Sequence, residues 1–253
     1  MSTLYLVGLG LGPGDMSPLA VEMVGRCRRT FCETYTSLIP ALDLDELKET
    51  LGTPVQRLNR GRVEGVEILL NALETGDTAL LVPGDPMIST THITLRVAAA
   101  ESGHASRIIH SSSIMSAAIG ESCLTATRFG RMATVSFMRS KQPYDVLADN
   151  RRAGLHTLFL LDVDEEAGRY MSVAQALDSL VSLEEEHGLG VIDDATVAIG
   201  MARLGSEDQV VEAGSVAGLL ESDLGPPPHC LAIPGDVHFS EREALRAVLG
   251  ARI

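Results

Sequence analysis

Two short segments of this chain place glycines, prolines and an aspartate at spacings that could form ligand-binding turns. The first, Gly8–Asp15, has glycine at every second position from 8 to 14, which lets a backbone pass close to another segment or to a ligand. The second, Pro83-Gly84-Asp85-Pro86, follows an apolar run that ends at Val82. The Asp85 carboxylate could accept a hydrogen bond from a ligand hydroxyl or amine. As an ordinary turn residue or helix cap it would instead bond only to its own chain.

The glycine spacing argues against the common phosphate-binding loops. A dinucleotide-binding Gly-x-Gly-x-x-Gly fingerprint that began at Gly8 would need glycine where the chain has Pro13. One that began at Gly10 would need glycine at Asp15, and the Gly-Lys-Ser/Thr of a P-loop is absent. Glu33 lies at the distance of a ribose-binding acid and is discounted together with the fingerprint. Nicotinamide or nucleotide binding is therefore disfavoured.

Alternating apolar and amphipathic stretches predict the elements that position these turns. Leu4–Val7 predicts a strand that leads into the glycine-rich turn, and Ser17-Pro18 is typical of a helix start. Asp77–Val82 predicts a buried strand with Asp85 just beyond its carboxyl end, where open α/β sheets bind ligands. The other predicted strands are Arg107–Ile109, Ala133–Phe137, Leu155–Asp162, Ala195–Ala202, Gln209–Glu212 and His229–Ile233, and the predicted helices are Val63–Leu73, Ile114–Gly120, Val173–Glu186 and Ser240–Leu249.

Strands that alternate with helices along the whole chain predict an α/β fold. The 253 residues are enough for one large domain or for two small ones. We place a boundary at the serine-rich segment near residue 111. The expected domains are an N-terminal α/β lobe of residues 1–111, which contains both turns, and a C-terminal α/β lobe of residues 112–253.

The composition disfavours several classes of protein. A formal net charge of −14 argues against nucleic-acid binding, which needs a basic patch, and would attract a positively charged protein partner. The acidic run Glu184-Glu185-Glu186 is expected to be a solvated helix end. Four cysteines without a Cys-x-x-Cys pair predict buried thiols in a reducing cytosol and no metal site. No apolar run approaches the roughly 18 residues of a membrane span, and no signal peptide is evident, so we expect a soluble cytoplasmic protein.

The two turns resemble the signature loops of the tetrapyrrole methylase superfamily, whose members bind S-adenosylmethionine in a cleft between two α/β lobes. Within that superfamily, several stretches resemble diphthine synthases of the archaeal type. These are Glu33-Thr34-Tyr35-Thr36-Ser37, Gly84-Asp85-Pro86-Met87-Ile88-Ser89-Thr90-Thr91-His92, Ile109-His110 with Ser113-Ile114, Gly154-Leu155-His156-Thr157-Leu158, Ala202-Arg203 with Gly205-Ser206, and Pro227-Pro228-His229. The resemblance spans essentially the whole chain. It departs from the family pattern at Gly12-Pro13-Gly14 and at Gly120–Leu124.

The resemblance implies a two-lobed tetrapyrrole-methylase-like fold and an S-adenosylmethionine-dependent N-methyltransferase. Its acceptor would be a histidine of translation elongation factor 2 that already carries a 3-amino-3-carboxypropyl arm. Methylation of the amino group on that arm, up to a trimethylammonium, would give diphthine in the biosynthesis of diphthamide. The second product would be S-adenosyl-L-homocysteine. The family is typically homodimeric, so a homodimer is the expected assembly.

The family's cofactor contacts carry over, position by position, onto eight residues of this chain. They are Leu11, Asp85, Ile88, Ser113, Ile114, Leu161, Ala202 and His229. The aliphatic members would line the pocket, while Asp85 and backbone groups of both turns would anchor it, as is usual for cofactor sites. His229 stands at the start of a predicted buried strand, where a capped core histidine would look the same.

The chemistry of methyl transfer needs few catalytic groups, and we expect a general base to be absent or replaced by water. An α-amino group titrates at roughly 7.7 to 8.0, so a neutral fraction capable of attack exists near neutral pH. Positioning the amine, the methyl group and the sulfur in line can account for much of the acceleration. His92 and His110 could orient the acceptor or accept its proton, and each could equally be structural.

Two other functions stay open. A corrin or precorrin C-methyltransferase of the same fold would need a wide, basic-lined cleft, and the acidic composition and Thr90-Thr91-His92 speak against it. A non-catalytic S-adenosylmethionine-binding regulator would bind the cofactor without methylating an acceptor. The presence of Asp85 and of both turns argues against such a dead site.

Overall fold

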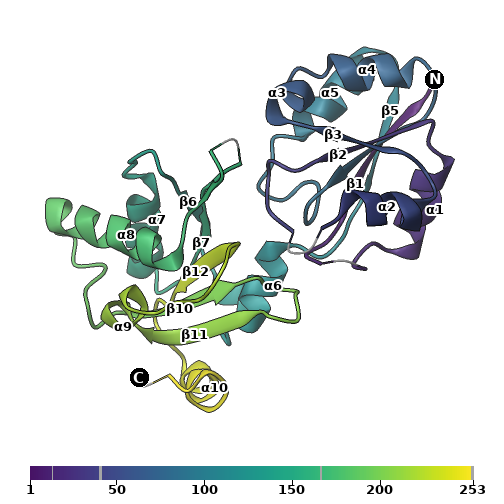
Figure 1. The fold of residues 1–253 in the computed structure, drawn as a ribbon. Helices are drawn as coiled ribbons and strands as arrows, with labels where there is room; N and C mark the ends of the chain where they lie inside the picture. Colours follow the sequence, from purple (N-terminus) through teal and green to yellow (C-terminus); the bar gives the residue numbers. More distant parts are fainter. Residues whose placement is uncertain (13, 40–41, 166, 252–253) are drawn as a thin grey trace. The chain divides into compact units, whose positions relative to one another are not determined.

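The computed structural model of this protein describes residues 1–12, 14–39, 42–165 and 167–251. They form two compact units, Met1–Ile114 and Met115–Ile253, each with a sheet and a hydrophobic core of its own (Figure 1). Both units combine strands and helices, so the predicted α/β class is confirmed.

The first unit is built on a parallel sheet with the strand order β3-β2-β4-β1-β5. Its strands are β1 (Thr3–Gly8), β2 (Arg29–Glu33), β3 (Val55–Leu58), β4 (Thr78–Val82) and β5 (Ala105–Ile109). The helices between them are α1 (Pro18–Arg26), α2 (Leu44–Leu51), α3 (Arg60–Glu64), α4 (Glu67–Leu73) and α5 (Ile93–Glu101). Every neighbouring pair of these strands runs parallel, so their carboxyl ends share one edge of the sheet.

The inner strand β1 is buried on both faces, because alternate side chains enter different cores. Leu4 and Leu6 pack into the core that includes residues of α3, α4 and α5. Tyr5 and Val7 pack into the core that includes residues of α1 and α2, on the other face of the sheet (Figure 1). This double burial holds the strand in place up to Gly8, where the glycine-rich turn begins.

The single helix predicted over Val63–Leu73 is wrong. The segment forms two helices, since α3 ends at Glu64 and α4 begins at Glu67. Val66 between them has a φ of 53°, a left-handed conformation that a continuous helix cannot contain. The apolar pattern did not reveal the break because Val63 and Leu73 face the same core.

The second unit has a mixed sheet with the strand order β11-β10-β12-β7-β6. Its strands are β6 (Ala133–Val135), β7 (Thr157–Leu161), β10 (Val197–Ala202), β11 (Val210–Ser215) and β12 (His229–Ile233), and β8 (Val163–Asp164) pairs separately with β9 (Arg169–Tyr170). Its helices are α6 (Ile114–Glu121, which begins at the last residue of the first unit), η1 (Ala126–Arg128), α7 (Gln142–Arg152), α8 (Val173–His187), α9 (Val216–Leu220) and α10 (Phe239–Leu249). Only β6 and β7 pair in parallel within the described sheet. The strands predicted over Ala195–Ala202 and Gln209–Glu212 are confirmed as β10 and β11, which pair antiparallel.

Glu184, near the end of α8, is not the solvated residue that the acidic run predicts. Its carboxylate accepts hydrogen bonds from Gly190 N at 2.7 Å, Val191 N at 2.8 Å and Tyr144 Oη at 3.0 Å. Burial alone would raise the pKa of Glu184, but these hydrogen bonds outweigh it and lower the pKa below its ordinary value. Glu184 therefore fixes the loop that follows α8, while the two glutamates after it are exposed as predicted.

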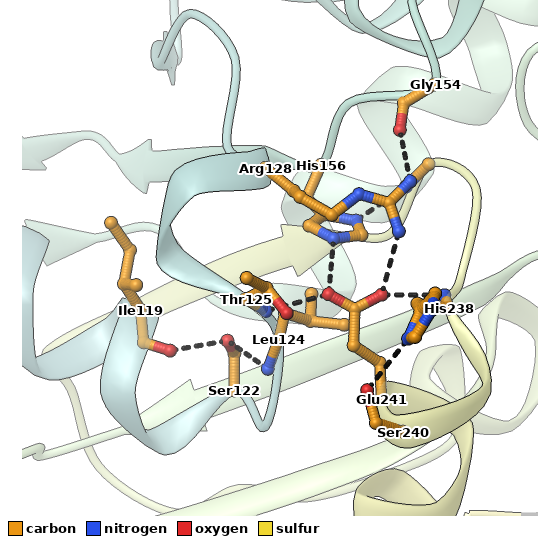
Figure 2. Close-up of polar contacts among 11 residues, drawn as sticks. Ile119, Ser122, Leu124, Thr125, Arg128, Gly154, His156, His238, Ser240 and Glu241 are labelled. Carbon is orange, nitrogen blue, oxygen red and sulfur yellow. Dashed lines mark hydrogen bonds and ion pairs between the residues drawn. The ribbon is translucent and has the colours of Figure 1, made fainter.

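A buried polar network ties α10 to the start of β7 (Figure 2). Glu241 Oε1 accepts hydrogen bonds from His156 Nε2 at 3.1 Å and from Thr125 N at 2.8 Å. Its Oε2 accepts one from His238 N at 2.8 Å and pairs with the Arg128 guanidinium at 3.3 Å. The side chains of His156 and Glu241 are 0% and 2% exposed. The buried Glu241 carboxylate thus contacts four donor groups.

The proton in this network sits on Nε2 of a neutral His156. Its Nδ1 accepts a hydrogen bond from Gly235 N at 3.0 Å, so Nε2 is the nitrogen that donates to Glu241. Burial lowers the pKa of His156 below 6.5, although the hydrogen bond to Glu241 opposes this. Burial would raise the pKa of Glu241, but the hydrogen bonds from His238, Thr125 and His156 prevail and lower it to about 2.

We expect the stability of the second unit to fall as the pH drops below about 6.5. Below that pH the unfolded chain binds a proton at His156, whereas the folded chain keeps the ring neutral. The contribution of the neutral ring to the free energy of unfolding is therefore complete above about pH 6.5, and it is lost as the pH falls through the lowered pKa of the folded state. Urea unfolding between about pH 5 and about pH 8 measures this slope. His156→Gln should make the slope smaller without abolishing it, since burial also lowers the pKa of His229. An unchanged slope would contradict this explanation.

Candidate active site

The glycine-rich turn lies between the loops that follow β4 and β5, at the carboxyl edge of the first sheet. β1 is the neighbour of both strands, and Gly10 and Gly84 exchange backbone hydrogen bonds of 3.2 and 2.8 Å. A Cβ built on Gly8 would lie 2.6 Å from Gly84 O and 2.7 Å from Ser111 Cβ. Glycine at position 8 therefore allows three segments to approach one another, as the alternating glycines predicted.

Asp15 closes the glycine-rich turn. Its Oδ2 accepts hydrogen bonds from Leu11 N at 2.9 Å and from Ser112 Oγ at 2.6 Å, and its backbone oxygen accepts one from Ser111 Oγ at 3.1 Å. The sequence pattern did not single out Asp15 for this role. The available signal was an aspartate four residues after Leu11, which can accept a hydrogen bond from the Leu11 backbone N–H within the turn. Pro13 of the same turn lies outside the described residues.

Asp85 joins the loop after β4 to the loop after β5. Its Oδ1 accepts a hydrogen bond from Met87 N at 3.0 Å. Its Oδ2 lies 2.7 Å from His110 Nδ1 and accepts a longer bond of 3.4 Å from Ser111 N. The carboxylate thus orders both loops through contacts within the chain. A direct contact from it to a ligand stays a prediction.

The two histidines proposed beside the site differ in their surroundings. His92 is buried, with Nδ1 3.0 Å from Pro86 O and Nε2 3.4 Å from Tyr35 Oη. Burial lowers its pKa, so the ring is neutral, and both of its nitrogens are occupied by contacts within the chain. His110, immediately after β5, has an exposed side chain.

Glu33, at the end of β2, shapes the segment that follows it. It is fully buried, and its Oε2 accepts hydrogen bonds from Tyr35 N at 3.0 Å and Thr36 N at 3.1 Å. The Arg60 guanidinium lies 5.2 Å from the centre of the Tyr35 ring. This role of Glu33 in the loop agrees with the prediction that it is not a ribose-binding acid.

Five of the eight predicted contact residues lie at the carboxyl edge of the first sheet. Leu11 follows β1, Asp85 and Ile88 follow β4, and Ser113 and Ile114 follow β5. Ile88 N donates a 3.2 Å hydrogen bond to Asp85 O. Leu11, Ile88 and Ile114 are half-buried and Ser113 is buried, so this edge offers partly accessible apolar side chains.

The other three predicted residues lie together at one end of the second sheet. Ala202 on β10 pairs with His229 on β12, and Cys230 pairs with Leu160 on β7, which places Leu161 beside His229. Leu161 and Ala202 are buried. The structure thus groups the predicted residues into two sets, one in each unit.

His229 is held by contacts within the second unit. Its Nδ1 accepts a 3.3 Å hydrogen bond from Val173 N at the start of α8. Its Nε2 donates toward Gly225 O at 3.0 Å and Pro226 O at 3.2 Å. Burial lowers the pKa of His229, so the ring is neutral and both nitrogens are engaged. Any ligand contact by this residue would use its backbone or a ring face.

A family model described as Tetrapyrrole (Corrin/Porphyrin) Methylases matches residues 3–220 of the chain. The chain belongs to this family. The predicted family and the predicted fold are thereby confirmed.

Family members similar to this chain over its length include curated proteins named diphthine synthase. The one from Methanothermobacter thermautotrophicus is 38% identical, over 98% of this chain and 96% of that protein. The one from Methanopyrus kandleri is 41% identical, over 98% of this chain and 97% of that protein.

Solved structures of family members are similar as well. A crystal structure of a diphthine synthase has a TM-score of 0.91 at 34% identity and covers 99% of this chain and 97% of that chain. That of a putative diphthine synthase from Entamoeba histolytica has a TM-score of 0.89 at 37% identity, covering 97% of this chain and 98% of that chain. The similarity therefore extends over both units of the family fold.

Other predicted features of this family member concern membranes, metals and thiols. Within the described residues, the helices are too short or too polar to cross a membrane, and His, Cys, Asp and Glu side chains form no group of three that could hold a metal ion. Burial raises the pKa of Cys27 to about 11 and that of Cys32 and Cys230 to about 12. These three thiols therefore stay protonated and unreactive near neutral pH.

Proposed function

We propose that this chain is a diphthine synthase. It would methylate the amino group of the 3-amino-3-carboxypropyl-histidine of translation elongation factor 2, with S-adenosyl-L-methionine as methyl donor and S-adenosyl-L-homocysteine as by-product. The observation that carries this proposal is the match to curated diphthine synthases over 96–97% of their own length. Membership of the methylase family shows a methyltransferase, and the relatives' shared name supports the specific acceptor.

We place the cofactor at the eight residues carried over from the family. Those in the first unit are Leu11, Asp85, Ile88, Ser113 and Ile114, and the contacts carried over for Leu161, Ala202 and His229 stay predictions from the resemblance. Two features of the first unit fit this cofactor. A Cβ on Gly10 would come within 2.1 Å of Asp15 Cβ, so glycine at this position allows Asp15 to close the turn. Half-buried aliphatic side chains stand beside that turn, which suits an adenine ring and a methionine chain.

The bound cofactor supplies an electrophilic methyl group on a positively charged sulfur. The residues of this chain then have three tasks: they hold both partners in line, exclude water and keep the acceptor amine neutral. Asp85 and Asp15 help to hold the two reactants in line, because they tie together the loops after β4, β5 and β1. Small displacements of the reacting atoms lower the rate of transfer steeply. The backbone of the glycine-rich turn would then contact the cofactor without side-chain interference.

Two alternatives are less well supported. The family description includes corrin and porphyrin methylases, but the full-length curated relatives cited above are named diphthine synthase. A regulator that binds S-adenosylmethionine without methylating an acceptor lacks a supporting observation. We further propose a cytoplasmic homodimer whose partner is elongation factor 2, with neither nucleic acid nor membrane as a direct partner.

The proposal is tested by transfer of radiolabelled methyl groups from S-adenosylmethionine. We expect label to enter elongation factor 2 that carries the amino-carboxypropyl arm, and neither unmodified elongation factor 2 nor a precorrin. Asp85→Ala should reduce incorporation about 100-fold because it releases the loops after β4 and β5. Asp45→Ala, at an exposed position on α2, is the matched control and should have full activity. Label in a precorrin alone would exclude the proposal.

A further inference from the structure

The pair formed by Asp85 and His110 joins a buried carboxylate to an exposed imidazole. Asp85 Oδ2 and His110 Nδ1 lie 2.7 Å apart, and the two side chains are 8% and 69% exposed. The carboxylate is held from the other side by Met87 N at 3.0 Å. The short contact and the buried partner fix the orientation of a ring whose other face is open to solvent.

The hydrogen bonds around Asp85 also set the tautomer of His110. Asp85 accepts hydrogen bonds from the N–H groups of Met87 and Ser111, which identifies its oxygens as acceptors. Nδ1 of His110 is therefore the donor in the 2.7 Å contact, and the lone pair of the neutral ring lies on Nε2. The same arrangement, in which a buried carboxylate orients a histidine base, recurs in hydrolases.

His110 occupies the edge of the sheet at which the cofactor is placed. Its neighbour Ser111 approaches the glycine-rich turn so closely that a Cβ on Gly8 would lie 2.7 Å from Ser111 Cβ. Of the neighbouring acidic residues, Asp85 contacts the ring directly, whereas Asp15 accepts a hydrogen bond from Ser111 Oγ through its backbone oxygen.

We propose that His110, oriented by Asp85, accepts the proton of the acceptor amine before each methyl transfer. This proposal rests on the proposed function. The proton of the ammonium passes to Nε2 of His110 and then to water, which leaves a neutral amine with a free electron pair. That pair forms the new nitrogen–carbon bond while the carbon–sulfur bond breaks, and the sulfur keeps the electrons of the broken bond.

Repeated methylation explains why an exposed base suits this site. The first and second transfers leave a methylated ammonium that still carries protons, so one proton must be removed before the next methyl group can be added. The third transfer leaves a quaternary nitrogen with none. A ring that is 69% exposed can return each proton to solvent while the acceptor stays bound. His92, which is buried and bonded through both ring nitrogens, cannot serve in this way.

The first test follows methyl addition by intact-mass spectrometry with wild-type protein, His110→Ala and His104→Ala. At about pH 7 we expect His110→Ala to be about 100-fold slower and to accumulate singly methylated product, an effect at the low end for general-base catalysis. The deficit should shrink as the pH rises above roughly 8, where solvent alone deprotonates the amine. Added imidazole should restore part of the rate. His104, at the opposite end of β5, is the control and should retain full activity.

The second test uses nitrogen-15 NMR of labelled histidine, without any cofactor or acceptor. We expect the His110 ring to carry its proton on Nδ1 in the wild type, and Asp85→Asn to weaken that preference. Calorimetric binding of S-adenosylmethionine to His110→Ala measures any loss caused by releasing Asp85, and the methylation rates are therefore compared at saturating cofactor.

The outcomes separate this proposal from the proposed function. If the wild type methylates the acceptor but His110→Ala has the same rate, or a deficit that is equal at every pH, the role of His110 is refuted. If the wild type does not methylate the acceptor at all, the function itself is refuted.

Discussion

Glu241→Ala is expected to lower the free energy of unfolding of the second unit by about 3 kcal/mol or more, at roughly 1–3 kcal/mol for each buried donor left without an acceptor. The substitution leaves the N–H groups of Thr125 and His238 and the Nε2–H of His156 without their acceptor in a site that excludes water. The Arg128 side chain is 31% exposed and can be rehydrated, so the loss comes chiefly from the buried donors. Chemical unfolding monitored on the second unit measures the effect.

Two further substitutions sharpen this prediction. Glu241→Gln keeps one oxygen acceptor but presents an NH₂ group to donors, so its loss should be smaller than that of alanine. Glu243→Ala, at an exposed position on the same helix, should change the stability by no more than about 0.5 kcal/mol. Equal effects of Glu241→Ala and Glu243→Ala would show that the network does not stabilise the unit.

Gly8→Ala is expected to disrupt the cofactor site of the first unit. The added methyl group would meet Gly84 O at 2.6 Å and Ser111 Cβ at 2.7 Å, and both are parts of tightly packed segments. Relief of this overlap requires the three loops to separate, at a cost of about 1–3 kcal/mol in stability. We also expect affinity for S-adenosylmethionine to fall about 100-fold, as measured by calorimetry.

Gly25→Ala is the matched control for Gly8→Ala. Gly25 lies in α1 of the same unit, has no neighbour within 4 Å of its built Cβ, and lacks a positive φ. Alanine there should raise the stability by about 0.5–1 kcal/mol because glycine is unfavourable within helices. Unchanged cofactor affinity in Gly8→Ala would mean that the approach of the three loops does not form the site.

The glycine-rich turn and the strand before it could be predicted because the relevant interactions are local. A buried run followed by alternating glycines indicates a strand and a tight turn, and Ser17-Pro18 indicates the next helix start, which the structure bears out. Neither β2 nor β3 was predicted. For β3 the reason is that only its two end residues are buried and that Arg57 within it breaks the apolar pattern. The left-handed Val66 leaves no periodic signal.

Contacts between distant segments could not be predicted from the sequence. Thr125 and His156 reach Glu241 from 116 and 85 residues away, so no spacing pattern reveals their network. The sequence likewise placed His92 and His110 on an equal footing. Tertiary packing separates them, because it buries one ring between Pro86 and Tyr35 and leaves the other exposed on Asp85.

The most direct test of the central claim is tandem mass spectrometry of elongation factor 2 carrying the amino-carboxypropyl histidine, after incubation with this protein and S-adenosylmethionine. We predict mass gains in steps of one methyl group, with fragment ions that place every added methyl on the nitrogen of the arm. An unmodified histidine arm after incubation with protein that binds S-adenosylmethionine would contradict the assignment as a diphthine synthase.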